Sequence, residues 1–169
     1  MQDQTTIRPI QPGDAMAFLD LKKKLDRESK FMLLEPQERN STLEEIRKEI
    51  EFLSLNHNGT ILIAETENQI VGYLSLERGA FRRIHHTVYL VTGILQKYWK
   101  KGIGSALLEK AIYWCRENRI QRIELTVLTP NTSAIALYKK FGFEKEGVRK
   151  RAILLEGKLM DEYYMAKLL

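Results

Sequence analysis

The chain has 169 residues, enough for one domain with a substantial core and too few for two domains of ordinary size. It is 44% hydrophobic and 29% charged, which excludes a disordered segment. The net charge of +5 suits an anionic partner, either nucleic acid or a small ligand that carries phosphates. The Lys and Arg residues are spread along the chain, and none stands in a motif of a nucleic-acid reader, so we expect most of them at the solvated surface.

Hydrophobic periodicity and turn residues predict the helices and strands in chain order. We expect a strand at 6–10, helices from 14 and from 41, strands at 60–65, 70–77 and 86–95, a helix at 102–118, a strand at 122–128, a helix at 131–141, and strands at 143–155 and 159–168. Asp14 is the expected cap of the first helix, and Ser41–Glu45 carries a capping box for the second. The order β-α-α-β-β-β-α-β-α-β-β mixes hairpins with one helical crossover, which predicts an α+β fold in a single domain over 1–169.

Features of the sequence also indicate the compartment. The first residues, MQDQTTIRP, lack the basic and apolar regions of a secretory signal, and no apolar run approaches the roughly 20 residues that span a bilayer. The single cysteine, Cys115, excludes an internal disulfide and fits a reducing compartment. We therefore expect a cytoplasmic protein without membrane contact. Cys115 stands beside Trp114 in an apolar helix, which predicts a core residue rather than a nucleophile.

The most informative stretch is Tyr98–Leu108, where two glycines stand one residue apart at a strand-to-helix junction. Glycine lets a ligand approach bare N–H groups, and a helix N-terminus attracts phosphate oxygens. Lys100 and Lys101 add positive charge at the rim. A Walker A loop needs its lysine after the second glycine, and a dinucleotide fingerprint needs a third glycine where this chain has Leu107. The stretch predicts a pyrophosphate site of another kind, although the glycines alone are equally compatible with a flexible loop.

Two signatures together resemble the GNAT superfamily of N-acetyltransferases. Trp99–Leu108 is similar to its acyl-CoA pyrophosphate loop, and Asn131–Phe143 is similar to its signature Asn-x-x-Ala-x-x-Leu-Tyr-x-x-x-Gly-Phe. The likeness is plain from about His86 to Gly147. It implies a mixed, mostly antiparallel twisted sheet flanked by about four helices, with acetyl-CoA as cosubstrate and no metal. It further implies transfer of the acetyl group to a primary amine by direct attack in a ternary complex.

The resemblance also assigns roles to single residues. Tyr138 is expected as the general acid for the departing thiolate, and the backbone N–H of Ile94 as an oxyanion donor. Gly93, within the same strand, is compatible with a bulge. Asn131 is expected to bond the pantetheine arm, to cap its helix, or both. The residues expected at the coenzyme are Ile94, Leu95, Lys100, Lys101, Gly102, Ile103, Gly104, Ser105, Asn131 and Tyr138.

The family pattern usually has Gln or Arg where this chain has Trp99. That position acts mainly through its backbone, so we expect coenzyme binding to be kept. The Trp99 side chain either covers the adenine side of the coenzyme or packs as an ordinary core residue, and both interpretations stay open.

The residues that handle the acceptor amine are less well defined. No carboxylate stands between Arg83 and Gln96, where many members of the superfamily carry their general base. The candidates left for the general base are His85, His86, Glu28, Glu35, Glu124 and ordered water. Of these, Glu124 is expected to pair with a cation instead. Glu28, Phe31 and Glu35 are expected near the acceptor, and Glu38, Asp161 and Glu162 are further carboxylates able to attract a cationic amine. The expected acceptor is a small-molecule amine, a polyamine, or a protein or peptide N-terminus.

Two other functional classes stay open at this point. A non-catalytic acyl-CoA-binding regulatory module would explain the missing strand carboxylate, and a measured transferase rate would exclude it. A basic RNA- or ribosome-associated protein would fit the charge but has no motif behind it, and it would show salt-sensitive RNA binding without turnover. A homodimer is compatible with the resemblance.

Overall fold

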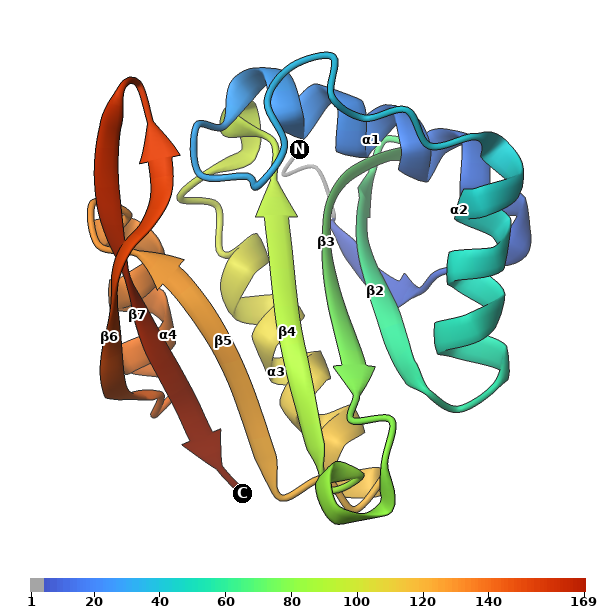
Figure 1. Cartoon of the computed structure of the whole chain (residues 1–169). Helices are drawn as coiled ribbons and strands as arrows, with labels where there is room; N and C mark the ends of the chain where they lie inside the picture. The colour runs from blue at the N-terminus through green and yellow to red at the C-terminus, as the bar shows by residue number, and fades with distance from the viewer. Residues whose placement is uncertain (1–4) are drawn as a thin grey trace.

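The structure, a computed structural model, describes residues 5–169. Residues 1–4, which belong to the segment in which we expected no secretory signal, lie outside the described range. Within residues 5–169 the helices and strands follow the predicted order (Figure 1). They are β1 (Thr6–Pro9), α1 (Ala15–Glu28), α2 (Leu43–Ile50), β2 (Gly59–Thr66), β3 (Gln69–Arg78), β4 (Thr87–Ile94), α3 (Ile103–Glu117), β5 (Arg122–Leu128), α4 (Thr132–Lys140), β6 (Glu144–Leu155) and β7 (Lys158–Leu168). No helix in this range is long and apolar enough to cross a membrane.

The starts of the first two helices show how local sequence sets their boundaries. At α2 the Thr42 side chain accepts the N–H of Glu45 while the Glu45 carboxylate accepts the N–H of Thr42, which confirms the capping box. Asp14 stands at the N-cap position of α1, but its side chain makes no cap bond. It accepts from Arg8 at 2.8 Å instead. Its Oδ2 also accepts from the Gln11 N–H at 2.7 Å, at the start of the short turn Pro12–Asp14. The predicted capping of α1 by Asp14 is therefore wrong, because Asp14 has helical backbone angles at the end of that turn and its carboxylate is bonded to Arg8 and Gln11.

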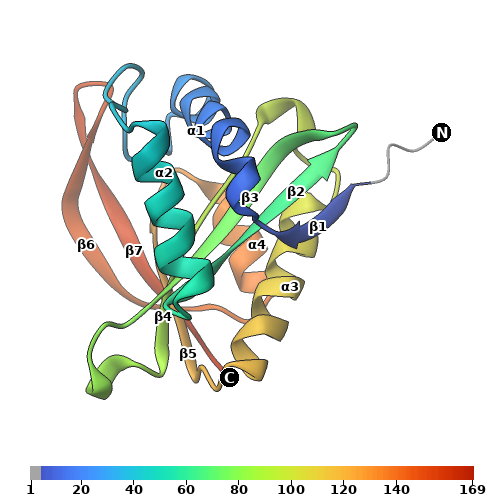
Figure 2. The same ribbon diagram turned by 90° about the vertical axis from the view of Figure 1, so that its right-hand side faces the viewer.

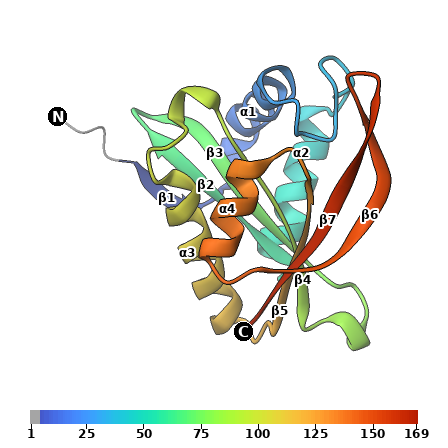
Figure 3. The same ribbon diagram turned by 90° about the vertical axis from the view of Figure 1, so that its left-hand side faces the viewer.

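The strands form one sheet in the order β1-β2-β3-β4-β5-β7-β6. Every neighbouring pair is antiparallel except β4 and β5, which α3 connects as a crossover. The mixed, mostly antiparallel α+β sheet is thus confirmed. Helices α3 and α4 cover one face, and α1 and α2 cover part of the other face (Figures 2 and 3).

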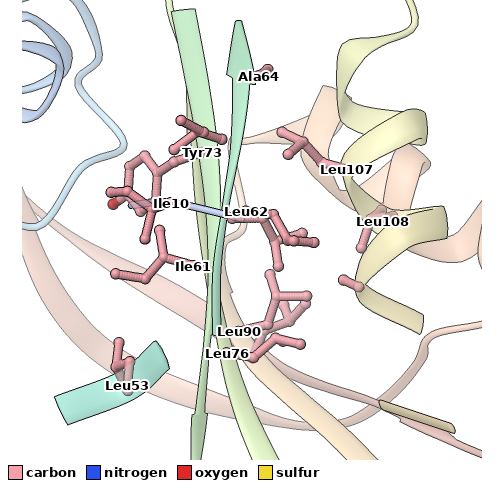
Figure 4. Close-up of a cluster of buried hydrophobic side chains, with 14 of the residues drawn as sticks. Ile10, Leu53, Ile61, Leu62, Ala64, Tyr73, Leu76, Leu90, Leu107 and Leu108 are labelled. Atoms are coloured by element: carbon pink, nitrogen blue, oxygen red, sulfur yellow. The ribbon is translucent and has the colours of Figure 1, made fainter. Parts of the chain in front are cut away.

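The core lies on both faces of the central strands. Alternate residues of β2 to β4 point in opposite directions. In Figure 4, Ile10, Ile61 and Tyr73 lie on one side of the strands and Leu62, Leu76 and Leu90 lie on the side of Leu107 and Leu108. The Phe18 ring of α1 meets the Tyr73 ring edge to face, with centroids 5.2 Å apart. Because β2 is covered on both faces, its residues 61–64 are all buried, as in the strands of buried sheets.

Strands β4 and β5 separate soon after they begin. They pair only through Thr87–Tyr89 and Arg122–Glu124. Beyond this point β4 follows β3 as far as Ile94 and β5 follows β7 as far as Leu128, so a gap opens between them toward the top of Figure 1. The facing edges of β4 and β5 are therefore not paired with each other beyond Tyr89 and Glu124.

Gly93 does not form the bulge that its position suggested, since the register between β3 and β4 runs through it without a shift. Its missing side chain serves packing instead. A Cβ at Gly93 would lie 2.8 Å from Leu25 Cδ1, so the glycine lets α1 approach the sheet closely.

Candidate active site

The edge of β4 that faces the gap offers backbone N–H groups. The N–H of Leu95 donates to the carbonyl of Val71 at 2.9 Å, on the β3 side. Successive residues of an antiparallel strand direct their backbone groups to opposite sides, so the N–H groups of Ile94 and Thr92 point away from β3 and into the gap. The Ile94 donor was predicted, and Thr92 was not, because only the register identifies it. Leu95 does not face the gap, since its carbonyl also accepts from the Tyr98 N–H.

Helix α3 begins at the mouth of the gap without a capping side chain. Gly102 is its N-cap, with a positive φ of 80°, and the first bond inside the helix joins the Ala106 N–H to the Gly102 carbonyl. The N–H groups of residues 103–105 therefore have no partner within the helix. Lys100 and Lys101 stand exposed at the rim. Unpaired N–H groups at a helix N-terminus beside two lysines are the features that an anion-binding cradle requires.

Gly104 has a second role in this cradle. A Cβ there would lie 2.8 Å from Leu137 Cδ2 and 3.5 Å from Ile94 Cδ1, so the glycine lets α3, α4 and the end of β4 meet.

Two side chains fasten the connection between β4 and α3. The Trp99 indole Nε1 donates to the carbonyl of Ile94 at 2.7 Å, and the Trp99 side chain is otherwise largely exposed. Glu28, at the end of α1, accepts from the N–H of Gln96 at 2.9 Å. Trp99 thus occupies the Ile94 carbonyl and leaves the Ile94 N–H for a ligand. Glu28 lies close to the gap, as expected, but one of its oxygens is already bonded.

Two predicted residues belong to helix α4, Asn131 at its N-cap and Tyr138 within it. The Asn131 side chain accepts from the Ala134 N–H at 3.3 Å, so Asn131 does cap the helix. Tyr138 is 6% exposed and packs against Phe143 with ring centroids 5.6 Å apart. Burial raises the pKa of Tyr138, and the nearby Tyr89 raises it further, so this hydroxyl stays protonated throughout the physiological range.

The face of the sheet opposite α3 and α4 has an uncovered part, which we call the open face. Its residues are Tyr89, Val91, Thr126, Tyr164, Glu162 and Arg149. Their side chains point to the α1–α2 side of the sheet, where the two helices leave β5 to β7 and the first part of β4 uncovered. The Tyr89 hydroxyl and Thr126 Oγ1 lie 2.8 Å apart. A cavity of about 380 Å³ opens here, lined by Tyr89, Thr126, Tyr164 and the ion pairs of Arg122 with Glu124 and Glu146. The expected pairing of Glu124 with a cation is therefore confirmed.

The connection between α1 and α2 borders the open face and lies beside the tip of the β6–β7 hairpin (Figures 1 to 3). It carries the half-buried Phe31 and the exposed Glu35. A buried ion pair holds it, because Arg39 donates to both oxygens of Asp26 at 2.6 and 3.0 Å. Asp26 and Arg39 are 13 positions apart in sequence, which explains why no local pattern revealed the pair.

The histidine candidates lie elsewhere. His85 precedes β4 and contacts Arg78 and the carbonyl of Gly79, at 3.2 and 3.1 Å. The gap donors are at the other end of β4, and at about 3.3 Å per residue the strand separates the two ends by roughly 20 Å. The structure therefore does not bring His85 or His86 to the gap.

The separated parallel strands, the cradle and the buried tyrosine together define an acyltransferase domain. Residues 24–143 match the model of the Acetyltransferase (GNAT) family, and the chain belongs to this family.

The chain is similar to proteins of known and proposed N-acetyltransferase activity. The L-amino acid N-acetyltransferase AaaT of Escherichia coli is 37% identical over 108 residues, which cover 63% of this chain and 66% of AaaT. The ribosomal protein uS5-alanine N-acetyltransferase of Escherichia coli is 34% identical over 104 residues, which cover 59% of this chain and 52% of the enzyme. The match thus leaves a third or more of each relative's length outside it.

Solved structures show the same fold. The crystal structure of a GNAT family acetyltransferase from Streptococcus pneumoniae matches with a TM-score of 0.95 and 33% identity, covering 98% of this chain and 100% of that one. The structure of yncA from Salmonella typhimurium, with its cofactor acetyl-CoA, matches with a TM-score of 0.87 and 19% identity, covering 98% and 94%.

Proposed function

We propose that this protein transfers the acetyl group of acetyl-CoA to a primary amine by direct attack in a ternary complex. The observation that carries the proposal is the separation of β4 and β5, which leaves backbone donors of β4 without a strand partner. The uncapped N-terminus of α3 and the buried Tyr138 support it. The names of two relatives specify amino acids and the alanine of a ribosomal protein as acceptors. An amine of one of these two kinds is therefore the expected acceptor.

The coenzyme would lie along the gap. Its pyrophosphate would accept from the N–H groups of Ile103, Gly104 and Ser105, with the helix dipole and the two rim lysines balancing its charge. Its pantetheine arm would run along β4 past Ile94 and reach Asn131 at the start of α4. This course leaves the thioester near Thr92 and Ile94, level with the open face.

In the reaction the amine nitrogen forms a bond to the thioester carbon, and the carbonyl oxygen takes up negative charge. The N–H groups of Ile94 and Thr92 are placed to stabilise this oxyanion. The carbon–sulfur bond then breaks, and the Tyr138 hydroxyl gives its proton to the departing thiolate. An ordinary tyrosine has a pKa of about 10 and a thiol of about 8.5, so the tyrosine must in turn recover a proton from the acidic N–H of the intermediate.

A calorimetric titration with acetyl-CoA tests the coenzyme site. We expect stoichiometric binding to the wild-type protein and none to Gly104→Glu, which places a carboxylate and its bulk in the cradle. Gly13→Glu is the control for the added carboxylate, because no atom lies within 4 Å of a Cβ at Gly13. Thermal unfolding of Gly104→Glu shows whether the contact of its Cβ with Leu137 has disturbed the fold. If the wild-type protein did not bind acetyl-CoA, the proposed function would be wrong.

Release of free thiol in the presence of a panel of amines then tests turnover. Thiol release that depends on an amine supports the transferase. Tight binding of acetyl-CoA without thiol release from any amine would favour a non-catalytic acyl-CoA-binding module.

A further inference from the structure

The acceptor subsite can be inferred from the far side of the gap, on the assumption that the proposed function is right. Glu162 of β7 lies opposite Leu128, the last residue of β5. Tyr89 pairs with Glu124 before the strands separate, so the same register continued for four residues brings Gly93 level with Leu128. Glu162 is thus one strand beyond the gap, about 4.8 Å from β5, at the height of the two backbone donors of β4.

Glu162 also lies on the side from which an acceptor must enter. Paired residues of neighbouring strands share a face, so Glu162 and Tyr164 lie on the same face as Thr126. The Thr126 hydroxyl contacts Tyr89 there. This is the open face, whereas Tyr138 comes from α4 on the other side. A thioester in the gap would therefore have its general acid on one side and Glu162 on the other.

The bonding of Glu162 leaves it able to accept a further hydrogen bond. Its residue is only 8% exposed, and its Oε2 accepts from Nη1 of Arg149 at 3.1 Å. Among residues 5–169, nothing donates to its Oε1. Arg149 gives Glu162 one of its five N–H groups, and its side chain is 51% exposed. A carboxylate oxygen and a guanidinium with spare donors thus stand side by side on neighbouring strands.

The other acidic groups around the open face differ from Glu162 in exposure. Glu28 and Glu124 each have one bonded oxygen, and Asp161 accepts from the Lys150 side chain and from the Arg151 N–H. Glu28, Glu35 and Glu146 are exposed, and Glu124 and Asp161 are partly exposed, whereas Glu162 is buried. Because a buried carboxylate oxygen without a donor favours a charged hydrogen-bond partner, Glu162 is the carboxylate of this face best suited to receive an ammonium group.

The geometry of β6 fixes the position of Arg149. The register places Arg149 opposite Glu162 and then Ile153 opposite Met160, so residues 150–152 bulge out opposite Asp161 alone. Arg151 within this bulge has a positive φ of 51°. Bulges bend a strand and re-aim its side chains, and here the bulge begins directly after Arg149. The β6–β7 hairpin therefore lies beside the α1–α2 connection and borders the open face (Figure 3).

We propose that Glu162 and Arg149 bind the two charges of an α-amino acid acceptor. The Oε1 atom of Glu162 accepts a hydrogen bond from the α-ammonium group, which loses one proton to solvent before its nitrogen attacks the thioester. The free N–H groups of Arg149 bind the α-carboxylate. The amino acid side chain lies along Thr126 and Tyr164 into the cavity of about 380 Å³. A peptide N-terminus supplies the ammonium group but no adjacent carboxylate, and a polyamine has no carboxylate at all.

The experiment measures kcat and KM from thiol release with L-amino acids and with the corresponding amino acid amides. Each variant is compared with the wild-type protein on the same acceptor, so that intrinsic amine reactivity cancels. Arg149→Met, which keeps the apolar stem, is expected to lower kcat/KM at least tenfold for the amino acids, mainly through KM, and less than twofold for the amides. Glu162→Gln is expected to lower kcat/KM at least tenfold for both.

Glu65→Gln is the matched control, because it breaks the ion pair with Arg8 on β1, away from the open face. It should change neither acceptor class by more than twofold. Calorimetric titration with acetyl-CoA and thermal unfolding of each variant separate a local loss from a loss of the fold.

The inference is overturned if Arg149→Met weakens the amides as much as the amino acids, or if Glu162→Gln leaves turnover unchanged. It is also overturned if the wild-type protein acetylates peptides or polyamines but not free amino acids. In each of these cases the proposed function stands. A wild-type protein that releases no thiol with any amine overturns the proposed function and the inference with it.

Discussion

Substitution of Arg39 by Met should destabilise the protein and loosen the connection between α1 and α2. The Asp26 side chain is 2% exposed and receives two hydrogen bonds from Arg39, at 2.6 and 3.0 Å. Lys22, on the same helix, cannot take over because Glu49 binds it at 2.6 Å. Removal of the guanidinium leaves a buried carboxylate without its cation, which costs about 3–5 kcal/mol. That is a large part of the roughly 5–15 kcal/mol that a domain has in total.

Urea denaturation at neutral pH measures the effect. A loss of about 4 kcal/mol, with an m-value of about 2 kcal/mol/M, moves the midpoint by about 2 M. Adding Asp26→Asn to the Arg39→Met variant removes the buried charge and should restore most of the lost stability. Because the connection borders the open face, we also expect a higher KM for the acceptor and unchanged acetyl-CoA binding.

The exposed pair of Glu44 and Lys48 on α2 provides the matched control. Their side chains are 74% and 71% exposed, so Glu44→Gln should cost less than about 0.5 kcal/mol. A loss below about 1 kcal/mol for Arg39→Met would show that the buried pair behaves like this surface pair. A double variant that stays as unstable as Arg39→Met would show that the uncompensated charge is not the cause. Either result would refute the reasoning.

Three further predictions concern single residues. Tyr138→Phe should lower kcat about 10²- to 10⁴-fold in the thiol-release assay without changing acetyl-CoA binding, and an unchanged kcat would exclude Tyr138 as the general acid. Cys115→Ala should keep kcat within about twofold, because burial raises the pKa of the Cys115 thiol to about 12 and direct attack needs no covalent intermediate. A folded but inactive Cys115→Ala variant would contradict direct attack. The Arg8 guanidinium lowers the pKa of Asp14 below its ordinary value of 3.8, so this pair stabilises the fold at pH 7 and the stabilisation disappears as the pH falls through the lowered pKa. Denaturation of the wild-type protein and Asp14→Asn from pH 7 to pH 2 should show the difference between them shrinking, and a constant difference would contradict this assignment.

The order of helices and strands could be predicted because each element depends on residues close together in sequence. The box of Thr42 and Glu45, the buried Cys115 and the uncapped start of α3 at Gly102 all belong to this kind. Where a distant partner competes, local reasoning fails. Arg8 draws the Asp14 side chain away from the helix that Asp14 was expected to cap.

The candidate site divides along the same line. Sequence signatures predicted the cradle and Tyr138, because the motifs that contain them are contiguous, and Ile94 was predicted from the strand that precedes the first motif. The signatures did not show that the N–H of Thr92 points into the gap. They also did not show that the backbone groups of Leu95 are already bonded to Val71 and Tyr98. That distinction depends on the register between β3 and β4, and a shift of one residue would exchange the two.

The sequence by itself thus determined the succession of elements and the family of the protein, and it predicted the phosphate cradle, all from short-range patterns. Only the tertiary structure decided where β4 and β5 separate and which side chains surround the opening. Arg149 and Glu162 are 13 positions apart, and so are Asp26 and Arg39. Such pairs form because strand register and the packing of a helix against its connection bring them together, and these depend on the whole fold at once.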